Sequence, residues 1–344
     1  MQFQNLEIYN AAELVNNPDG SISWRRVPKA VYDAMDSDQG RRQASGSTGV
    51  ELRFVLKGES ATIRMSNFSG STEAFNSFHV YYGGIQGGWM DHEVNKYVGG
   101  TPTDFVIHRP EYPDRLKKMT EFSGYDWDSE VVRIIFDRGS YKLYGISGEV
   151  EPPKPCQTPR KTLLAYGSSI THGSNSIDMS HSWVSLLAHN LNMDARNLGM
   201  AGSCAMEPEM AEYIAAEGEQ GKWDVAVLEL GINVLAWEPE KIQCRVENIL
   251  RQVAGRNPEK PVVVISPFYY CREDFEDCKH GQKWRTAISQ IVEKLNYSNV
   301  TYCNGLELLP DMSGISADQV HPNIYGVQQI AQRLTERLQE ILRR

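Results

Sequence analysis

The chain has 344 residues, more than one domain usually contains, and its 41% hydrophobic and 23% charged residues are typical of a folded globular protein. The formal net charge of -9, without a stripe of Lys and Arg, argues against a nucleic-acid-binding role, and no apolar run approaches membrane-spanning length. A small-molecule or neutral partner fits this composition better.

The N-terminal stretch mixes polar and apolar residues and lacks the basic-then-apolar order of a secretory signal. We therefore expect a cytoplasmic protein, or a secreted one if a signal has been removed. The cysteines include no CxxC pair, which predicts reduced thiols rather than a zinc site or a disulfide framework; they are Cys156, Cys204, Cys244, Cys271, Cys278 and Cys303. Of these, Cys271 and Cys278 could pair under oxidation.

From about residue 50 to residue 150 the apolar residues recur with a period near two, in short runs separated by turn-rich pieces. This spacing is typical of an antiparallel β-sandwich, and helical signals here are weak. We predict a jelly-roll-like sandwich domain over residues 1–150, with strands in the runs VELRFVL, ATIRMSN, NSFHVYY, TDFVIHR, EVVRIIFD and YKLYGISGEV.

The segment EPPKPCQTPR, residues 151–160, carries four prolines. Proline has no backbone N–H and fixes its own φ angle, so this segment cannot sustain a helix or a central strand. We interpret it as the linker to a second domain, residues 161–344.

After the linker, strand-like apolar runs alternate with helical segments. Strands that are buried on both faces and alternate with helices predict a parallel sheet with helices on both faces. Ligands of such sheets bind beyond the carboxyl ends of the strands. Candidate site residues should therefore directly follow the strand runs KTLLAYG, ARNLG, DVAVLELG, PVVVISP and VTYCNG.

Two adjacent serines follow the first of these strands, in the sequence GSSITHGS that begins at Gly167. The next helix is predicted to begin near Ser182. A serine at this junction suits a nucleophile, because the N–H groups at a helix N-terminus favour negative charge. It equally suits a helix N-cap, since a hydroxyl needs an adjacent base to react.

Glycines and an asparagine follow the second and third strands. The sequence NLGMAGS places Asn197, Gly199 and Gly202 at the same sheet edge, where glycine N–H groups can face a ligand or simply form tight turns. The sequence LELGINVL places Asn233 two residues after Gly231, where its amide can donate to a developing oxyanion or stabilise a turn.

A base for the serine is expected from a histidine that a carboxylate orients. Near the C-terminus, SADQVHPNIYG supplies Asp318 and His321, with Pro322 predicted in the first turn of the last helix. The three-residue spacing lets the Asp318 carboxylate reach Nδ1–H of His321 and leaves Nε2 to take a serine proton. Surface loops often contain Asp and His together, so it is the position after the last strand that supports this pair.

These four blocks together resemble the SGNH hydrolases, the superfamily of GDSL-type lipases and esterases, over about residues 160 to 344. The resemblance implies a flavodoxin-like sheet of five parallel strands with helices on both faces. It implies that Ser169, not Ser168, is the nucleophile, because GSSIT aligns with the G-D-S-L motif. His321 is then the base and Asp318 the acid that orients it.

The resemblance also implies an oxyanion hole formed by the backbone N–H groups of Ser169 and Gly202 and by the Asn233 side-chain amide. The sequence departs from the family pattern where Ser168 replaces the Asp of G-D-S-L and Val234 replaces the Asp of G-x-N-D. Neither position belongs to the triad, so the departures concern loop geometry. The implied reaction is ester hydrolysis through an acyl-enzyme, with no metal and no organic cofactor.

A β-sandwich before an SGNH domain is similar to the arrangement in certain carbohydrate esterases, including acetyl-xylan esterases. The implied substrate is an acetyl or other short-chain ester of a small molecule or oligosaccharide. We expect no nucleic-acid or membrane partner, and a homo-oligomer is compatible with the sequence. The alternatives are an acyltransferase that uses the same triad and a sugar-binding protein with a vestigial catalytic domain.

The other histidines and aromatic residues considered for a functional role are explained at least as well by structural roles. The sequence contains neither a G-x-S-x-G elbow nor a nucleotide-binding G-x-x-x-x-G-K-[ST] loop. His172 could face the site or occupy a helix turn, and the remaining histidines have no identified partner. Aromatic side chains that could line a sugar or acyl pocket, or pack in a core, are Tyr81, Tyr82, Trp89, Phe268, Tyr269 and Tyr270.

Overall fold

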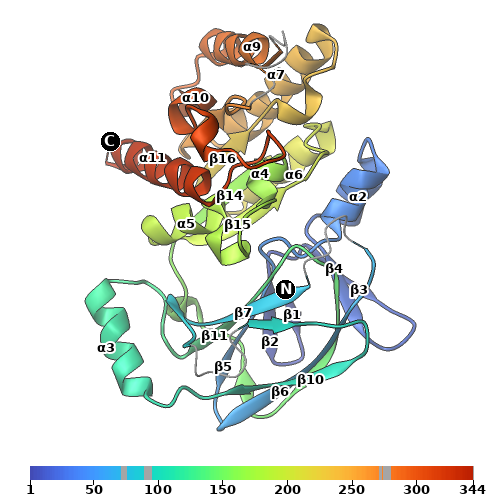
Figure 1. Cartoon of the computed structure of the whole chain (residues 1–344), viewed down its shortest axis with the longest axis vertical. Helices are drawn as coiled ribbons and strands as arrows, with labels where there is room; N and C mark the ends of the chain where they lie inside the picture. Colours follow the sequence, from blue (N-terminus) through green and yellow to red (C-terminus); the bar gives the residue numbers. More distant parts are fainter. Residues whose placement is uncertain (71–75, 89–94, 271–272, 274–279, 344) are drawn as a thin grey trace. The chain divides into compact units, whose positions relative to one another are not determined.

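The computed structural model describes residues 1–343 except 71–75, 89–94, 271–272 and 274–279 (Figure 1). The described residues form two compact units. The first comprises Met1–Lys29, Arg42–Arg160 and Asn192–Asp194, and the second comprises Ala30–Arg41, Lys161–Leu191 and Ala195–Arg344. The suggested Cys271–Cys278 pair and Trp89 lie outside the described residues.

The first unit contains two antiparallel sheets. The strands of the larger sheet are β1 (Gln2–Phe3), β2 (Leu6–Tyr9), β5 (Glu51–Leu56), β7 (Ser77–Tyr82), β8 (Ile85–Gln86), β9 (Asn95–Tyr97), β11 (Val131–Phe136) and β13 (Val150–Glu151). Their order is β1-β2-β5-β11-β7-β8, with β13 paired to β5 and β9 paired to β7. The smaller sheet has the order β10-β6-β12-β4-β3, formed by β3 (Glu13–Asn16), β4 (Ile22–Arg25), β6 (Ser60–Asn67), β10 (Thr103–His108) and β12 (Tyr141–Ser147).

The sandwich core consists of the alternating apolar residues of both sheets. Leu52 and Phe54 of β5 and Ile63 and Met65 of β6 are completely buried in it. Alternate residues of a strand face the same side of its sheet, so a period of two places every second side chain in the core. The predicted antiparallel sandwich is confirmed.

A helix that the strand-like periodicity did not indicate lies within this unit. Helix α3 (Pro113–Ser123) begins with a proline at its first turn, and Gly124 ends it in the left-handed conformation at φ 69. Among its residues only Thr120 is buried. Of its apolar side chains, Leu116 packs against the sandwich core whereas Met119 and Phe122 are exposed, so the helix lacks the wide buried face that a sequence pattern detects best.

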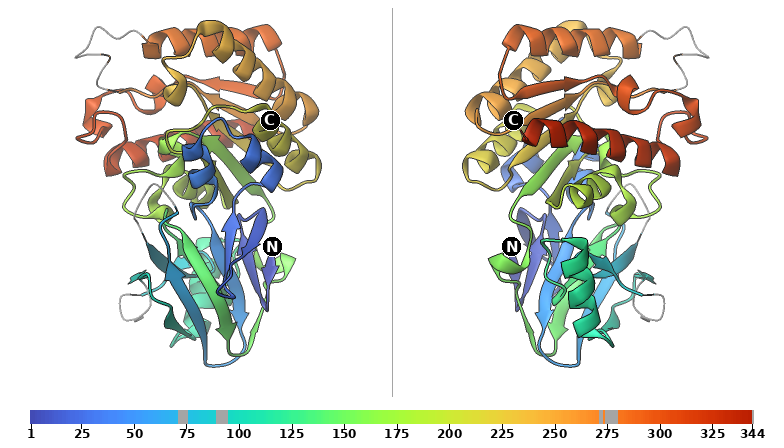
Figure 2. Two further views of the ribbon diagram at one scale, coloured as in Figure 1. Left: turned by 90° about the vertical axis from the view of Figure 1, so that its right-hand side faces the viewer. Right: turned by 90° about the vertical axis from the view of Figure 1, so that its left-hand side faces the viewer.

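The second unit contains one parallel sheet of five strands. They are β14 (Thr162–Gly167), β15 (Asp194–Gly199), β16 (Val225–Glu229), β17 (Val262–Ile265) and β18 (Val300–Cys303), in the order β15-β14-β16-β17-β18. Helices α5 (Trp183–Asn190) and α11 (Ile324–Leu342) pack together, as do α6 (Pro208–Glu219), α7 (Pro239–Arg256) and α9 (His280–Leu295), and the two groups cover opposite faces of the sheet (Figure 2). The predicted SGNH fold is confirmed.

The start of the last helix differs from the expectation. Helix α11 begins at Ile324, and Asn323 is its N-cap, with Oδ1 accepting from the N–H groups of Tyr325 and Gly326. Pro322 therefore lies before the cap and not in the first turn. The Asn323 side chain accepts hydrogen bonds from two of the free N–H groups at the helix start. The sequence instead predicts a proline, which has no N–H, in this first turn.

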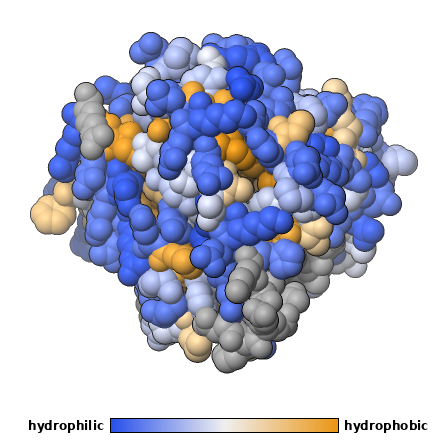
Figure 3. Space-filling model, turned by 90° about the horizontal axis from the view of Figure 1, so that it is seen from above, coloured by the Kyte–Doolittle hydropathy of each residue, from blue (hydrophilic) through white to orange (hydrophobic). Residues whose placement is uncertain are grey.

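None of the helices in the described ranges is both long and apolar enough to cross a membrane. The face of the molecule in Figure 3 is mainly hydrophilic, and its hydrophobic side chains occur in separate small patches.

Candidate active site

Three predicted side chains come together beyond the end of β14. Ser169 is the first residue of the short helix α4 (Ser169–His172), and His321 lies on the loop before α11. His321 Nε2 lies 2.7 Å from Ser169 Oγ, and His321 Nδ1 lies 2.8 Å from Asp318 Oδ2. A hydroxyl, an imidazole and a carboxylate are therefore linked in the order that nucleophilic acyl transfer requires.

Hydrogen bonds hold both oxygens of the Asp318 carboxylate. Oδ1 accepts from the N–H groups of Val320 at 3.0 Å and His321 at 2.9 Å. Burial raises the pKa of Asp318, but hydrogen bonds from the backbone N–H groups of His321 and Val320 and from the His321 side chain outweigh it and hold the pKa well below its usual range. Asp318 is therefore ionised, and Nδ1 of His321 carries the proton that it accepts.

Asn175 is a residue at this site that sequence reasoning missed. Its backbone is left-handed at φ 64, a conformation that asparagine tolerates. Its Nδ2 group donates to Asp318 Oδ2 at 2.7 Å and to Ser316 Oγ at 2.9 Å. Asn175 thus ties the turn after Ser169 to the loop that carries Asp318 and His321, 143 positions away in sequence, and no motif of the sequence analysis included this contact.

Ser168 and Glu229 shape the turn that presents Ser169. Ser168 Oγ accepts the N–H of Ile170 at 3.1 Å, so it caps α4, as an aspartate in this motif position could also do. Glu229 ends β16 and is fully buried. Its Oε2 accepts the N–H of Ser168 at 2.7 Å and the hydroxyl of Thr171 at 3.0 Å, a role that no sequence motif indicated.

Substitution of Glu229 by glutamine tests the state of this buried acid. Burial raises the pKa of Glu229, and the hydrogen bonds from Ser168 and Thr171 offset the rise only in part. When the pKa of an acid is higher in the folded state than in the unfolded state, the unfolding free energy of the protein falls as pH rises above the unfolded pKa, which is about 4.3 for Glu. We expect the unfolding free energy of the wild type to fall relative to that of Glu229→Gln between about pH 4 and about pH 7, measured by urea denaturation. A difference that does not change with pH would contradict the raised pKa.

Two more loops at this sheet edge carry the predicted oxyanion donors. The N–H of Met200 donates to Gly167 O at 2.8 Å, which ties the loop after β15 to the end of β14. In that loop Gly202 has φ +63, which glycine adopts without strain. The N–H of Cys204 donates to Asn233 Oδ1 at 3.0 Å, which ties it to the loop after β16. Because Oδ1 of Asn233 accepts this bond, its Nδ2 group is left to donate.

These donors match the needs of acyl-transfer chemistry. Ser169 occupies the first position of α4, where the helix provides no acceptor for its N–H. The N–H of Gly202 and the amide of Asn233 are donors of the type that stabilise a tetrahedral oxyanion. Among the residues that the structure describes, no group of three or more His, Cys, Asp or Glu side chains is arranged to hold a metal ion.

The part of the chain that contains these residues matches a known protein family. Residues 165–329 match the GDSL-like Lipase/Acylhydrolase family. This segment is a GDSL-like lipase/acylhydrolase domain. The match includes all five predicted site residues, which are Ser169, Gly202, Asn233, Asp318 and His321. No curated protein matches the sequence.

Several solved structures resemble nearly the whole chain. The salicylyl-acyltransferase SsfX3 from a tetracycline biosynthetic pathway is 18% identical with a TM-score of 0.74, over 98% of this chain and 95% of that one. A putative GDSL-like lipase from Bacteroides ovatus is 17% identical with a TM-score of 0.70, over 98% of each chain. A family two carbohydrate esterase from Cellvibrio japonicus is 12% identical with a TM-score of 0.64, over 98% of this chain and 95% of that one. At these identities the likeness shows a shared fold.

Several polar residues of the GDSL-like domain stabilise the loops around the site. His172 is fully buried, and its Nδ1 lies 3.0 Å from Gly199 O. Asn197 donates to Thr171 O at 2.8 Å and accepts the N–H of Gly199 at 2.8 Å. A side chain on Gly199 would collide with the His172 backbone, so close approach requires glycine there. These contacts hold the end of β15 against α4.

The aromatic residues proposed as pocket walls are mostly core residues. Phe268, Tyr269 and Tyr270 follow β17 and are 1%, 8% and 2% exposed. The hydroxyl of Tyr270 accepts the N–H of Gly281 at 3.1 Å. In the sandwich unit, Tyr82 is also buried. Packing is therefore the better interpretation for these four side chains.

The D-x-x-H spacing of Asp318 and His321 recurs in the GDSL-like domain at Asp178 and His181. His181 Nδ1 lies 2.9 Å from Asp178 Oδ1, a partner that the sequence did not identify. Asp178 also accepts the N–H of His181 and caps the turn Met179–His181. At both positions the spacing places an Asp carboxylate against a histidine. The two pairs differ because it is His321 that also bonds the hydroxyl of Ser169.

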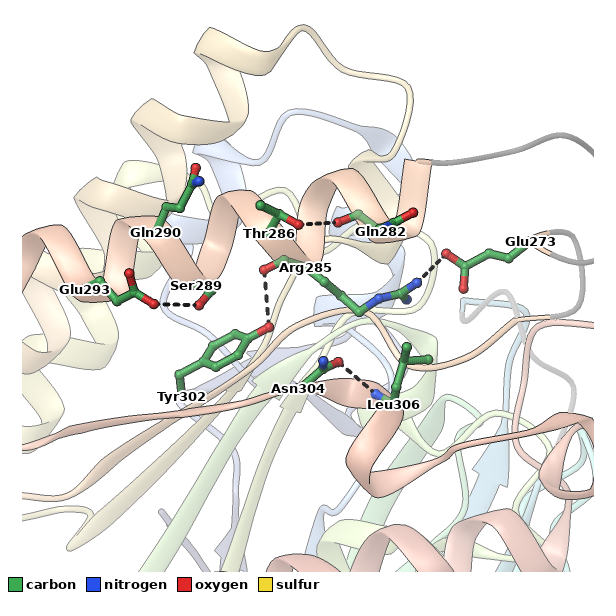
Figure 4. Close-up of a pocket in the computed structure, with 10 residues that line it drawn as sticks. All are labelled: Glu273, Gln282, Arg285, Thr286, Ser289, Gln290, Glu293, Tyr302, Asn304 and Leu306. Carbon is green, nitrogen blue, oxygen red and sulfur yellow. Dashed lines mark hydrogen bonds and ion pairs between the residues drawn. The ribbon is translucent and has the colours of Figure 1, made fainter.

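A separate pocket of about 780 Å³ lies between α9 and the residues in and after β18 (Figure 4). Its polar groups bond one another: Arg285 pairs with Glu273 at 2.5 Å and accepts, through its carbonyl, the hydroxyl of Tyr302 at 3.2 Å. No triad or oxyanion residue is among its described lining residues, which are Glu273, Gln282, Arg285, Thr286, Ser289, Gln290, Glu293, Tyr302, Asn304 and Leu306. This pocket is therefore distinct from the cluster of Ser169, His321 and Asp318.

Proposed function

We propose that the protein is a serine esterase that hydrolyses short-chain esters, acetyl esters of carbohydrates above all, through Ser169, His321 and Asp318. The observation that carries the proposal is the continuous chain of hydrogen bonds from Ser169 Oγ through His321 to Asp318, at 2.7 and 2.8 Å. The family of the domain supports hydrolase chemistry.

The proposed reaction has two halves. Ser169 Oγ attacks the ester carbonyl while His321 Nε2 takes the hydroxyl proton, and the N–H groups of Ser169 and Gly202 with the Asn233 amide stabilise the oxyanion. The intermediate then collapses, the C–O bond to the alcohol breaks, and His321 returns the proton to the leaving alcohol. Water attacks the acyl-enzyme by the same route and releases the acid and free Ser169.

The carbohydrate substrate is supported by the solved structures. The neighbours include carbohydrate esterases of family two and an acetyl-xylan esterase from Butyrivibrio proteoclasticus that covers 88% of this chain at a TM-score of 0.56. The likeness to the family two enzyme from Cellvibrio japonicus extends over 98% of this chain, and so includes the sandwich as well as the GDSL-like domain. An enzyme of this architecture that acts on sugar esters is the simplest expectation.

A substrate screen tests this proposal. The purified protein is incubated with p-nitrophenyl acetate, butyrate and octanoate, and with acetylated xylose and glucose. We expect acetate release from the sugars and a rate that falls as the acyl chain lengthens. Failure to hydrolyse any of these esters would contradict an esterase, and a preference for octanoate would contradict a short-chain enzyme.

An acyltransferase is the second candidate, because SsfX3, which resembles nearly the whole chain, is described as a salicylyl-acyltransferase. Such an enzyme forms the same acyl-enzyme and passes the acyl group to an alcohol in place of water. Adding a sugar or phenolic acceptor to the p-nitrophenyl acetate assay distinguishes the two. Hydrolysis is the main activity if free acetate stays the main product, and transfer is the main activity if the acceptor ester replaces it.

Substitutions at Asn233 separate its two proposed tasks. Asn233→Ala removes both the Nδ2 donor and the acceptor for the Cys204 N–H, whereas Asn233→Asp keeps an oxygen for that N–H and loses the donor. We expect both variants to lower kcat about 100- to 1,000-fold, because a lost oxyanion donor acts on the transition state. Steady-state kinetics with a parallel thermal melt measures the effect. An Asn233→Asp variant with wild-type kcat would contradict the donor role.

A further inference from the structure

A segment from near the N-terminus belongs to the catalytic unit. Residues Ala30–Arg41 lie between strands β4 and β5 of the sandwich in sequence, yet they are part of the second unit. They include most of helix α1 (Lys29–Ala34) and the start of helix α2 (Asp38–Ala44), drawn in blue in Figure 2. Gln39 of this segment contacts the loop after β15 that carries Gly202.

We propose that Gln39 is a positioning residue of the oxyanion hole. Its Nε2 group donates to the carbonyl oxygen of Ala201 at 3.0 Å. That carbonyl and the N–H of Gly202 belong to one peptide group. A peptide group is planar and trans, so fixing the direction of its C=O also fixes the opposite direction of its N–H. Gln39 therefore orients the N–H that the proposed mechanism uses as a donor.

The same hydrogen bond strengthens the donor. Hydrogen bonds in a chain polarise one another, so a peptide whose carbonyl accepts a bond becomes a better donor through its N–H. The Ala201 carbonyl accepts a second bond, from Ser203 Oγ at 3.2 Å. The carbonyl oxygen of the Ala201–Gly202 peptide thus accepts two hydrogen bonds, and in the proposed mechanism the N–H of the same peptide donates one to the oxyanion.

The Gln39 side chain lies directly against Gly202. A Cβ atom on Gly202 would collide with Nε2 of Gln39, and the left-handed φ of +63 also disfavours a side chain there. Gly202 therefore serves two purposes, since it permits the loop conformation and leaves room for the amide of Gln39.

The segment also holds the far end of this loop. The N–H of Asp36 donates to Glu207 Oε1 at 3.4 Å. Arg245 of α7 pairs with Asp36 at 3.0 Å and donates to Met206 O at 3.3 Å. The loop from Met200 to Glu207 is thus anchored to residues 30–41 at both ends.

Kinetics of two Gln39 variants test the inference, which rests on the proposed esterase function. We expect Gln39→Ala to lower kcat about tenfold with KM nearly unchanged, because one hydrogen bond that matters most in the transition state is lost. Gln39→Glu should lower kcat further, because its carboxylate faces the Ala201 carbonyl and the developing oxyanion. Binding of an alkyl boronate, which forms a tetrahedral adduct with a catalytic serine, should weaken in parallel.

The controls separate positioning from folding and from the proposed function. Gln332→Ala is the matched control, because Gln332 bonds Glu336 on the surface of α11, and it should keep the wild-type kcat. An unchanged kcat in Gln39→Ala, or a change confined to KM, would overturn the positioning role. The positioning role would also be overturned if the melting temperature of Gln39→Ala fell so far that unfolded protein accounted for the lost activity. Ser169→Ala in the same assay tests the esterase proposal by itself, because this variant removes the proposed nucleophile and leaves Gln39 in place.

Discussion

Ser169→Ala should lower kcat for p-nitrophenyl acetate by about a millionfold, while Ser168→Ala keeps most of the turnover. Ser169 Oγ is the hydroxyl that His321 bonds, at 2.7 Å, so its removal leaves no atom to form the acyl-enzyme. Ser168 Oγ instead caps α4 through the N–H of Ile170, and losing a cap costs about 1 kcal/mol of stability.

The paired serines make each variant the control for the other. Both variants remove one hydroxyl from neighbouring buried positions, so a general effect of the substitution would appear in both. Circular dichroism and thermal melts verify that each is folded. Greater loss of activity in Ser168→Ala than in Ser169→Ala would overturn the assignment of the nucleophile.

Asp318→Asn should lower kcat about 10,000-fold with little change in folding. The carboxylate accepts the Nδ1 proton of His321 at 2.8 Å, and an amide can present its NH2 group there in place of an acceptor. The imidazole then carries its proton on Nε2 and cannot take one from Ser169. Since hydrogen bonds hold the pKa of Asp318 well below its usual range, its own protonation should not limit activity in mildly acidic buffer.

Asp178→Asn is the matched control for this experiment. Asp178 and His181 have the same spacing and a similar contact of 2.9 Å, but their pair caps a local turn. We expect Asp178→Asn to keep the wild-type kcat within a small factor. Near-wild-type turnover of Asp318→Asn would remove Asp318 from the triad, and a large loss in Asp178→Asn would show that the effect is not specific to the triad.

The fold was largely predictable because its signals are local. The five buried runs between residues 161 and 305 became β14 to β18, and the alternating runs before residue 150 became the sandwich strands. Burial on one face or on two leaves a periodic pattern in any short window of sequence. Helix α3 escaped because a mostly exposed helix lacks the wide buried face that gives such a pattern, and Asn323 displaced Pro322 from the helix start because capping depends on one side chain.

The candidate site was predictable only in part, for a different reason. Ser169 and Asn233 lie within a few residues of the ends of β14 and β16, and His321 lies shortly before α11, so chain order and topology place them at one sheet edge. Asn175 and Glu229 bond the site through side chains alone, and no spacing rule links them to it. The same is true of Gln39, whose partner lies in a loop far along the chain.

The second unit is assembled from separate stretches of sequence, so its parts are synthesised at different times. Gln39 and Ala201 are 162 residues apart, and a ribosome adding about 5–20 residues per second needs roughly 8 to 32 s to cover that interval. The segment that orients the Gly202 peptide is therefore among the first parts of the chain to emerge, whereas the loop it binds emerges far later. His321 follows 120 residues after Ala201, so after Gln39 a nascent chain presents Ser169 first, then the loop that contains Gly202, and His321 last.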